Sequence, residues 1–210
     1  MKRGIFIVLE GGEGTGKSTI GKWLKQKLEK QGKKVFLTRE PGGNGSPVAE
    51  KIRKIILDKD SNVLPLTEAY LFAASRAQHV REVIIPHLLN DEIVLCDRFV
   101  YSSYAYQGSG RKLGIENIKN INALAVDNCL PDLVLVFDLE PRLGIQRKQQ
   151  ACQDFNRLDN ENLKFHQIVR EAYLELAREN SDLFKIIEVN KPLEEVEKEV
   201  WQQIKNKLNF

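Results

Sequence analysis

Short, continuous apolar runs alternate with longer amphipathic segments along this chain. Five of these runs have the length and composition of strands, at residues 5–9, 35–38, 93–97, 133–137 and 185–189. Because the runs are apolar throughout rather than at every second position, we expect both faces of the sheet to be covered. Strands that alternate with helices need right-handed crossovers. The pattern therefore predicts an α/β fold of the doubly wound type, a five-stranded parallel sheet with helices on both faces.

Between the runs, apolar residues recur at the spacing of a helix face. This spacing predicts helices at residues 17–30, from 46–47 onward, and at 67–89, 115–128, 161–179 and 193–208. Pro86 lies inside the longest of them and is expected to bend or end it, because proline lacks the N–H and its ring crowds the preceding turn. Residues 149–156 are polar without apolar periodicity, which favours a mobile loop. No linker or repeat interrupts the pattern, so we expect one domain over residues 1–210.

The charge and the cysteines exclude several classes of partner. Positive and negative side chains nearly cancel, and the formal net charge of +3 over 210 residues is too small for a general nucleic-acid binder. No apolar stretch is long enough to span a membrane. The three cysteines, Cys96, Cys129 and Cys152, match no metal or redox spacing, and an odd, sparse count suits a reducing compartment. We therefore expect a cytoplasmic protein without a membrane or nucleic-acid partner.

A glycine-rich segment follows the first predicted strand and opens the first predicted helix. From Gly11 to Ser18 it matches the phosphate-binding pattern (P-loop) G-x-x-x-x-G-K-[ST]. Glycines let the backbone fold around phosphates with its N–H groups pointing inward. The lysine places a charge on the β- and γ-phosphates, and the serine hydroxyl binds Mg²⁺. The predicted residues of this nucleotide site are Gly11, Gly12, Glu13, Gly14, Thr15, Gly16, Lys17, Ser18 and Thr19.

An acid and a base follow the third predicted strand. Asp97 closes the apolar run and Arg98 comes next, so both side chains should face the ligand crevice at the carboxyl end of a parallel sheet. A metal held by the P-loop serine needs a second oxygen ligand from a neighbouring strand. We therefore predict Ser18 and Asp97 as the Mg²⁺ ligands.

Further arginines indicate a second phosphate-bearing ligand. Arg39 follows the second strand, and Arg53 and Arg76 lie on the helices that come next. Planar guanidinium groups suit phosphate oxygens and base edges. A switch GTPase is excluded, because residues 190–193 lack the acid of the N-K-x-D guanine motif and residues 138–141 lack the glycine of D-x-x-G.

Three longer segments carry a resemblance that runs from the first strand to the last helix. They are T-R-E-P-G-G at 38–43, L-F-A-A-S-R at 71–76 and D-R-F-V-Y-S-S-Y-A-Y-Q-G at 97–108. With these segments the chain resembles the bacterial thymidylate kinases. The resemblance implies transfer of the γ-phosphoryl group of ATP to thymidine 5′-monophosphate (dTMP), giving dTDP and ADP, with Mg²⁺ as cofactor. It also implies a homodimer formed through helices, with residues 67–89 as a candidate contact.

The resemblance further implies a base pocket. Phe72 would stack on thymine, Arg76 would bond the base edge, and Ser103 and Gln107 would contact the base or border it. The complete set of predicted substrate-binding residues is Glu13, Arg39, Glu40, Arg53, Phe72, Arg76, Arg98, Ser103, Tyr106 and Gln107.

The same resemblance implies contacts to the sugar and the acceptor phosphate. Arg53 and Arg98 would hold the 5′-phosphate, and Glu13 would approach the 3′-hydroxyl of the deoxyribose. Tyr106 would lie where a 2′-hydroxyl would protrude, which favours deoxyribose over ribose. The phosphate loop would therefore serve both substrates.

The family also carries a lid after its fourth strand, here an insertion at about residues 141–160, which closes over ATP. Gly14 leaves no arginine in the phosphate loop, so the charge on the transferring group should come from the lid. Arg147, Lys148 and Arg157 are the candidates, and the sequence does not rank them. The lid departs from the family pattern, because residues 156–159 read N-R-L-D in place of D-R-x-E. The predicted catalytic residues are Lys17, Arg98, Arg147 and Arg157.

Two other functions remain open at this point. A deoxynucleoside kinase would phosphorylate a neutral 5′-hydroxyl and would need a carboxylate base beside it, for which Glu40 is available. A non-catalytic module would bind ATP only to regulate a partner. The altered lid favours such a module, whereas the complete acceptor segments argue against it.

Overall fold

The computed structural model describes residues 4–151 and 155–208, whose strands form one sheet. The strands are β1 (Ile5–Gly11), β2 (Val35–Arg39), β3 (Ile93–Asp97), β4 (Leu133–Asp138) and β5 (Phe184–Glu188). All neighbours are parallel, in the order β2-β3-β1-β4-β5. The predicted five-stranded parallel sheet is therefore confirmed. The chain reverses its direction of travel across the sheet at β1, and the carboxyl ends of strands at such a point form a ligand crevice.

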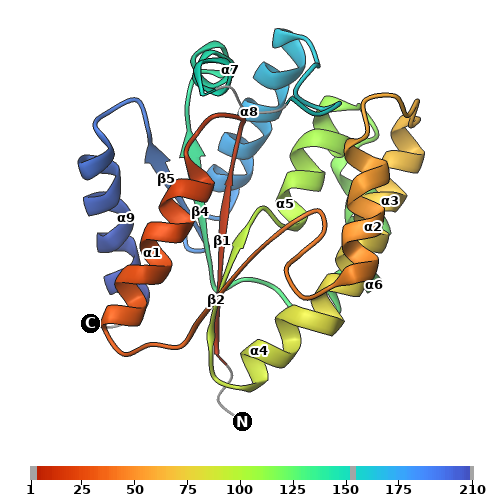
Figure 1. Ribbon diagram of the computed structural model, residues 1–210. Coiled ribbons are helices and arrows are strands. Elements are labelled where there is room, and N and C mark those ends of the chain that lie inside the picture. The colour runs from red at the N-terminus through yellow and green to blue at the C-terminus, as the bar shows by residue number, and fades with distance from the viewer. Residues whose placement is uncertain (1–3, 152–154, 209–210) are drawn as a thin grey trace.

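The helices form layers on both faces of this sheet (Figure 1). Their bounds are α1 (Lys17–Lys30), α2 (Pro47–Leu57), α3 (Pro65–His79), α4 (Ile85–Leu89), α5 (Val100–Ser103), α6 (Ile115–Val126), α7 (Pro141–Gln150), α8 (Leu163–Glu179) and α9 (Leu193–Leu208). Helices α1 and α9 cover one face, and α4, α5 and α8 cover the other, with α2, α3 and α6 beyond them. Among the described residues, no helix combines the length and the apolarity that a membrane crossing requires.

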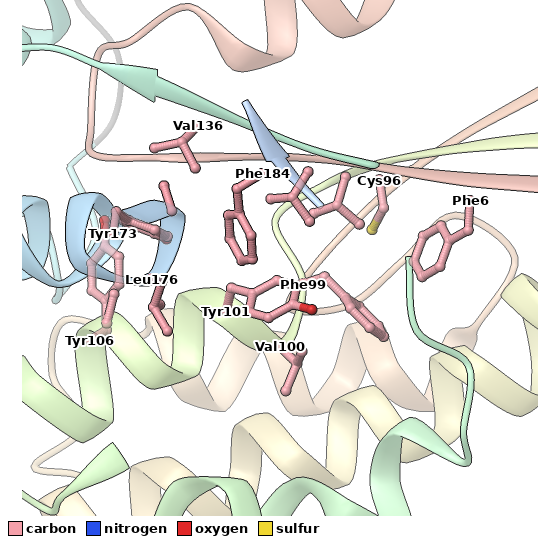
Figure 2. Close-up of a cluster of buried hydrophobic side chains, with 14 of the residues drawn as sticks. Phe6, Cys96, Phe99, Val100, Tyr101, Tyr106, Val136, Tyr173, Leu176 and Phe184 are labelled. Atoms are coloured by element: carbon pink, nitrogen blue, oxygen red, sulfur yellow. The ribbon is translucent and has the colours of Figure 1, made fainter. Parts of the chain in front are cut away.

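Strands β1, β3, β4 and β5 contribute side chains to two separate cores, whereas β2 contributes only to the second of them. In β1, Phe6 and Val8 pack under α4, α5 and α8, whereas Ile7 and Leu9 pack under α1 and α9, and all four are fully buried. Figure 2 shows the aromatic part of the first core, where Phe6 meets Phe99 edge to face. Because burial stabilises each such side chain by about 1.5–3 kcal/mol, both faces of the strand must be apolar. This two-sided burial explains the continuous apolar runs.

The long helical segment that contains Pro86 was expected to bend or end at this residue. It does not end at Pro86 but continues to Leu89, and a π-helical turn, η1 (Val80–Ile84), immediately precedes the proline's turn. The N–H of Ile85 reaches back to the carbonyl of Val80. A wider turn relieves the crowding between the proline ring and the preceding turn, so the chain can remain helical.

Two further predictions of local structure need correction. Residues 149 and 150, expected in a loop, belong to α7, and residues 155 and 156 are irregular, while residues 152–154 lie outside the described residues. A second π-helical turn, η2 (Tyr104–Gly110), follows α5 and was not predicted. It carries Tyr106 and Gln107, so its irregular pitch decides where two predicted site residues point.

Candidate active site

A cleft of about 430 Å³ opens at the carboxyl ends of β1, β2 and β3. The phosphate loop, the β2–α2 loop, α3, η2 and α7 all contribute to its wall. It collects these predicted site residues: Glu13, Gly14, Thr15, Gly16, Lys17, Ser18, Thr19, Arg39, Glu40, Arg53, Phe72, Asp97, Arg98, Tyr106, Gln107 and Arg147, together with the candidate Lys148. Arg76, Ser103, Arg157 and the first two glycines of the loop do not line it. Ser102 and Leu158 line it without having been predicted.

The P-loop lysine is held inside its own loop. Its Nζ donates to the carbonyl oxygens of Gly11 at 3.2 Å and Gly12 at 2.6 Å and to the hydroxyl of Thr15 at 3.0 Å. Burial lowers the pKa of Lys17 to about 8, and the nearby positive charge of Arg98 adds to this effect. These three acceptors keep the ammonium group at the place where a triphosphate would lie.

The depressed pKa of Lys17 predicts that nucleotide affinity depends on pH. A triphosphate binds the charged ammonium, and Lys17 in the empty protein loses that charge as the pH rises through about 8. We expect the dissociation constant for ATP to rise roughly tenfold between pH 7.5 and pH 9, because only the protonated fraction is competent to bind. Titration calorimetry measures it. The affinity for dTMP, which Lys17 does not contact in the proposed complex, serves as the control, and a flat profile for ATP would refute the prediction.

The two predicted metal ligands lie side by side. Ser18, in the first turn of α1, donates its hydroxyl proton to Asp97 Oδ2 at 2.5 Å. Both are hard oxygen donors at the mouth of the phosphate loop, which is the donor type that Mg²⁺ prefers. No group of three or more histidine, cysteine or acidic side chains that could hold a metal occurs among the described residues. The pair therefore fits a cation that takes its remaining ligands from substrate phosphates and water.

Arg98 is held against the phosphate loop at two points. One terminal nitrogen donates to the carbonyl oxygen of Gly11 at 2.9 Å, and the other donates to Glu13 Oε1 at 2.7 Å. Tyr106 donates its hydroxyl to the same Glu13 oxygen at 2.8 Å. Burial opposes the ionisation of Glu13, but the positive charges of Arg98 and Lys17 outweigh it and lower the pKa of this carboxyl to about 2. A fixed negative charge thus orients an arginine that lines the cleft.

Glu10, which the sequence analysis overlooked, supports this arrangement from behind. It is fully buried and accepts hydrogen bonds from the backbone N–H groups of Phe99 and Ser102, the Ser102 hydroxyl at 2.6 Å and the Tyr173 hydroxyl at 2.9 Å. Burial raises its pKa even though Ser102 and Arg98 act in the opposite direction. The only sign of this role in the sequence was the position of Glu10, an acidic residue between the apolar run at 5–9 and the first glycine of the phosphate loop.

Two further arginines line the cleft from the β2–α2 region. Arg39 bonds Glu50 at 3.0 Å and Asn44 at 3.3 Å, and it remains half-exposed. Arg53 donates to the carbonyl oxygen of Pro41 at 2.6 Å. Because each has donors left over, both can still contact an anion in the cleft. The predicted gathering of arginines at this edge of the sheet is therefore present in the structure.

Glu40 lies at the back of the cleft in a closed network of charges. Its carboxylate accepts from Arg76 Nε at 2.8 Å and faces His79 Nδ1 at 3.0 Å, and it is 4% exposed. Arg76 is 1% exposed and also donates to Ser103, Asn122 and the carbonyl oxygen of Phe99. Four of the five guanidinium N–H groups are thus engaged. Arg76 and Ser103 form a layer behind the cleft wall. The contact with the base that the sequence predicts for them would therefore have to come from the one free N–H of Arg76 and from the Ser103 hydroxyl.

The apolar end of the cleft is built around an aromatic ring. Phe72 of α3 packs with Ile56 and Leu158 in a small core of its own and also lines the cleft. Gln107 lines the same cleft and is fully buried. A flat apolar ring with a buried amide in one pocket suits a planar heterocycle that carries polar ring edges.

The three candidate cations of the lid point in different directions. Lys148 lines the cleft, pairing with Asp159 at 2.6 Å and lying 3.8 Å from Glu13. Arg147 also lines the cleft and donates to the carbonyl oxygen of Val189. Arg157 turns away from the phosphate loop, because it pairs with the buried carboxylate of Glu68 at 2.7 Å. The structure therefore separates candidates that the sequence left equal.

Gly14 faces helix α7 through backbone alone. A Cβ placed on Gly14 would lie 2.0 Å from the carbonyl oxygen of Gly144 in α7, and a Cβ on Gly144 would lie 2.2 Å from the carbonyl oxygen of Glu13. The two glycines thus let the phosphate loop and α7 touch. An arginine at position 14 would collide with this contact, so the absence of a P-loop arginine is tied to the position of α7.

Comparisons with known proteins agree with the site. The family model for thymidylate kinase matches residues 9–200. The thymidylate kinase of Bacillus cytotoxicus is 42% identical over 208 residues, covering 98% of this chain and 99% of that protein. The enzyme of the same name from Enterococcus faecalis is 46% identical over 205 residues, covering 96% of each chain.

The fold agrees as well. The crystal structure of thymidylate kinase from Ehrlichia chaffeensis superposes with a TM-score of 0.77 at 27% identity, covering 96% of this chain and 98% of that one. The matched lengths include the phosphate loop, the arginine-rich β2–α2 region and the segment around Arg98. The predicted fold and kinase activity are thereby confirmed, and the chain belongs to the thymidylate kinase family, the phosphotransferases that convert dTMP to dTDP.

Proposed function

We propose that this chain carries out the family reaction by bringing two anionic substrates together between Lys17 and Arg98. The observation that carries the proposal is the position of Arg98, which lines the cleft, bonds the phosphate loop at Gly11 and Glu13, and lies over the ring of Tyr106 on the neighbouring wall. The nucleophile is an anionic phosphate oxygen of dTMP, so no strong general base is needed. The barrier is one of positioning and charge neutralisation.

The lid contribution follows from where its cations point. Lys148 and Arg147 line the cleft and are proposed to neutralise charge on the transferring phosphoryl group. Arg157 was an equal candidate in the sequence, but it does not line the cleft and pairs with the buried carboxylate of Glu68. We assign it a structural part in the lid rather than a contact with the phosphates. Closure over ATP would also exclude water and limit hydrolysis.

The acceptor nucleotide is proposed to lie along the opposite wall. Phe72 would stack on the thymine ring, and Gln107 would bond its edge. Arg53 and Arg98 would hold the 5′-phosphate. The Tyr106 hydroxyl is fixed on Glu13 at 2.8 Å, and it would lie beside the sugar where a 2′-hydroxyl would protrude, which favours deoxyribose.

A divalent cation is proposed to bind at Ser18 and Asp97, where it would neutralise negative charge on the phosphates of ATP. Replacing Asp97 by asparagine should raise the Mg²⁺ concentration needed for half-maximal turnover by about 10- to 100-fold, since the charged partner of the metal is lost. A magnesium titration of ADP release measures this. Asp138→Asn, whose carboxylate pairs with Arg170 outside the cleft, is the matched control. An unchanged magnesium requirement in Asp97→Asn would exclude this site.

The test of the proposed function is a substrate panel. ADP release is followed with ATP and either dTMP, thymidine, another nucleoside monophosphate or no acceptor. We expect dTMP to give the fastest release and thymidine to give none above the background. Preference for thymidine would establish a nucleoside kinase, and ATP binding without acceptor-dependent release would establish a non-catalytic module. The nucleoside kinase is disfavoured because its candidate base, Glu40, has both oxygens engaged with Arg76 and His79.

A homodimer through the outer helices is also proposed. In the segment first considered for this contact, Val80, Ile84 and Leu88 are buried in the core and cannot take part. Two apolar side chains of that segment, Tyr70 and Leu89, are exposed, and further exposed ones occur at Leu64 and Leu66 beside the start of α3 and at Leu124 in α6. Light scattering on the purified protein would decide whether it is a dimer.

We also retain a cytoplasmic location as a proposal, based on the sparse cysteines.

A further inference from the structure

Glu68 is a carboxylate of α3 that the proposed mechanism does not use. It is fully buried, and three side chains donate to it. Gln107 Nε2 lies 2.8 Å from one oxygen, Arg111 donates to both oxygens at 3.2 Å, and Arg157 pairs with the second oxygen at 2.7 Å. Glu161 completes the cluster through an ion pair with Arg111. Glu68 thus connects the cleft to the segment that follows α7.

The contact with Glu68 fixes the direction in which the Gln107 amide faces. A carboxylate between two guanidinium groups acts only as an acceptor, so Gln107 must turn its NH₂ group towards it. Its Oε1 then points the other way. That oxygen is buried without a hydrogen-bond partner among the residues that the structure describes, and Gln107 lines the cleft. A buried acceptor of this kind needs a hydrogen-bond donor, and a ligand in the cleft can supply one.

We infer that Glu68 is a positioning residue for base selection, because it holds the Gln107 amide with its oxygen offered to the base. The inference rests on the proposed contact between Gln107 and the base. Thymine carries an N–H at position 3 of its ring, whereas cytosine carries an unprotonated acceptor there. An amide oxygen accepts from the first and repels the second. Glu68 thereby favours dTMP over dCMP without touching either.

The substitution Glu68→Gln tests this inference, because it should reverse the orientation of the Gln107 amide. The oxygen of the new amide should face Arg157 and Arg111, which both donate to the Oε2 position. Its NH₂ would then face Gln107, whose amide must rotate to accept from it and would offer its own NH₂ to the base. We expect the ratio of kcat/KM for dTMP over dCMP to fall by roughly ten- to a hundredfold. Glu161→Gln removes the same charge from the same cluster and should leave the ratio unchanged.

A double substitution separates this role from a purely structural one. In Glu68→Gln combined with Gln107→Glu, the carboxylate at 107 accepts from the amide at 68 and again offers an oxygen to the base. The preference for dTMP should therefore return at least in part. If Glu68→Gln lowers kcat/KM for both nucleotides equally and the double variant rescues nothing, the inference is overturned. Gln107→Leu separates the failure of the Glu68 inference from the failure of the proposed contact between Gln107 and the base. If Gln107→Leu also leaves the ratio of kcat/KM values intact, the proposed base contact fails as well.

A measurement on the unchanged protein covers the case in which Glu68→Gln does not fold. The side-chain NH₂ signals of Gln107, assigned by their loss in Gln107→Leu, are followed by NMR with and without dTMP. Because Glu68 holds this NH₂ in both states, the bonded proton should exchange slowly with water throughout. Rapid exchange in either state, or a reversal of the amide on adding dTMP, would overturn the inference.

Discussion

Arg98→Ala is expected to lower kcat by about a thousandfold while changing the affinity for ATP by less than about threefold. The guanidinium bonds Gly11 and Glu13 at 2.9 and 2.7 Å, and the proposed position of the acceptor phosphate lies against it. Removing it leaves two anionic groups to approach each other without their shared cation. ATP is held mainly by the backbone and lysine of the phosphate loop, so its binding should persist. Turnover at saturating substrates and calorimetry with ATP measure the two effects.

Two variants control this experiment. Arg98→Lys keeps the charge but has no fork to bond Gly11 and Glu13 together, so it should recover only part of the rate. Arg81→Ala removes an arginine from an exposed pair with Asp127 and should turn over like the unchanged protein. Full turnover in Arg98→Ala would remove this residue from the mechanism. Thermal unfolding of each variant identifies a loss that is due only to misfolding.

Gly144→Ala is expected to destabilise the protein by about 1–3 kcal/mol and to weaken ATP binding. In an unconstrained helix this change would stabilise by up to about 1 kcal/mol, because alanine has the higher helix propensity. Here the new methyl group would lie 2.2 Å from the carbonyl oxygen of Glu13, and backbone cannot move aside as a flexible side chain can. Helix α7 must then shift away from the phosphate loop. Denaturant unfolding and ATP titration measure the two effects.

Gly12→Ala is the matched control for stability. A Cβ on Gly12 meets nothing within 4 Å, and Gly12 is not among the glycines with positive φ. Its free energy of unfolding should therefore change by less than about 0.5 kcal/mol. If Gly144→Ala is as stable as the unchanged protein, the contact between α7 and the phosphate loop does not constrain the fold.

Local pattern was sufficient for much of this fold. The run at 93–97 was predicted with its bounds, because a strand buried on both faces needs uninterrupted apolar residues. The first strand was expected to end at residue 9 but extends to Gly11, since its pairing with β4 continues there. Of the two outcomes expected at Pro86, an end of the helix does not occur, because a π-helical turn at Val80–Ile84 precedes the proline and the chain stays helical to Leu89.

The partners of individual side chains were much harder to predict from the sequence than the helices and strands. The hydrogen bond between Glu10 and Tyr173 joins residues 163 positions apart, and that between Arg157 and the carbonyl of Ile56 spans 101. Nothing periodic in the sequence marks such pairs. A long charged side chain also reaches in many directions, so a position after the fourth strand did not reveal that Arg157 turns towards Glu68 rather than the phosphates.

The sequence by itself determined the parallel sheet, the phosphate loop and the family, because these depend on local periodicity and on short motifs. It also placed Arg39 and Arg98 at one edge, since strand ends in a parallel sheet coincide. The tertiary structure alone decided which lid cations reach the cleft and how the Gln107 amide is held. It also revealed why position 14 is glycine. These outcomes depend on contacts between distant segments, where a few ångströms decide whether two groups bond or collide.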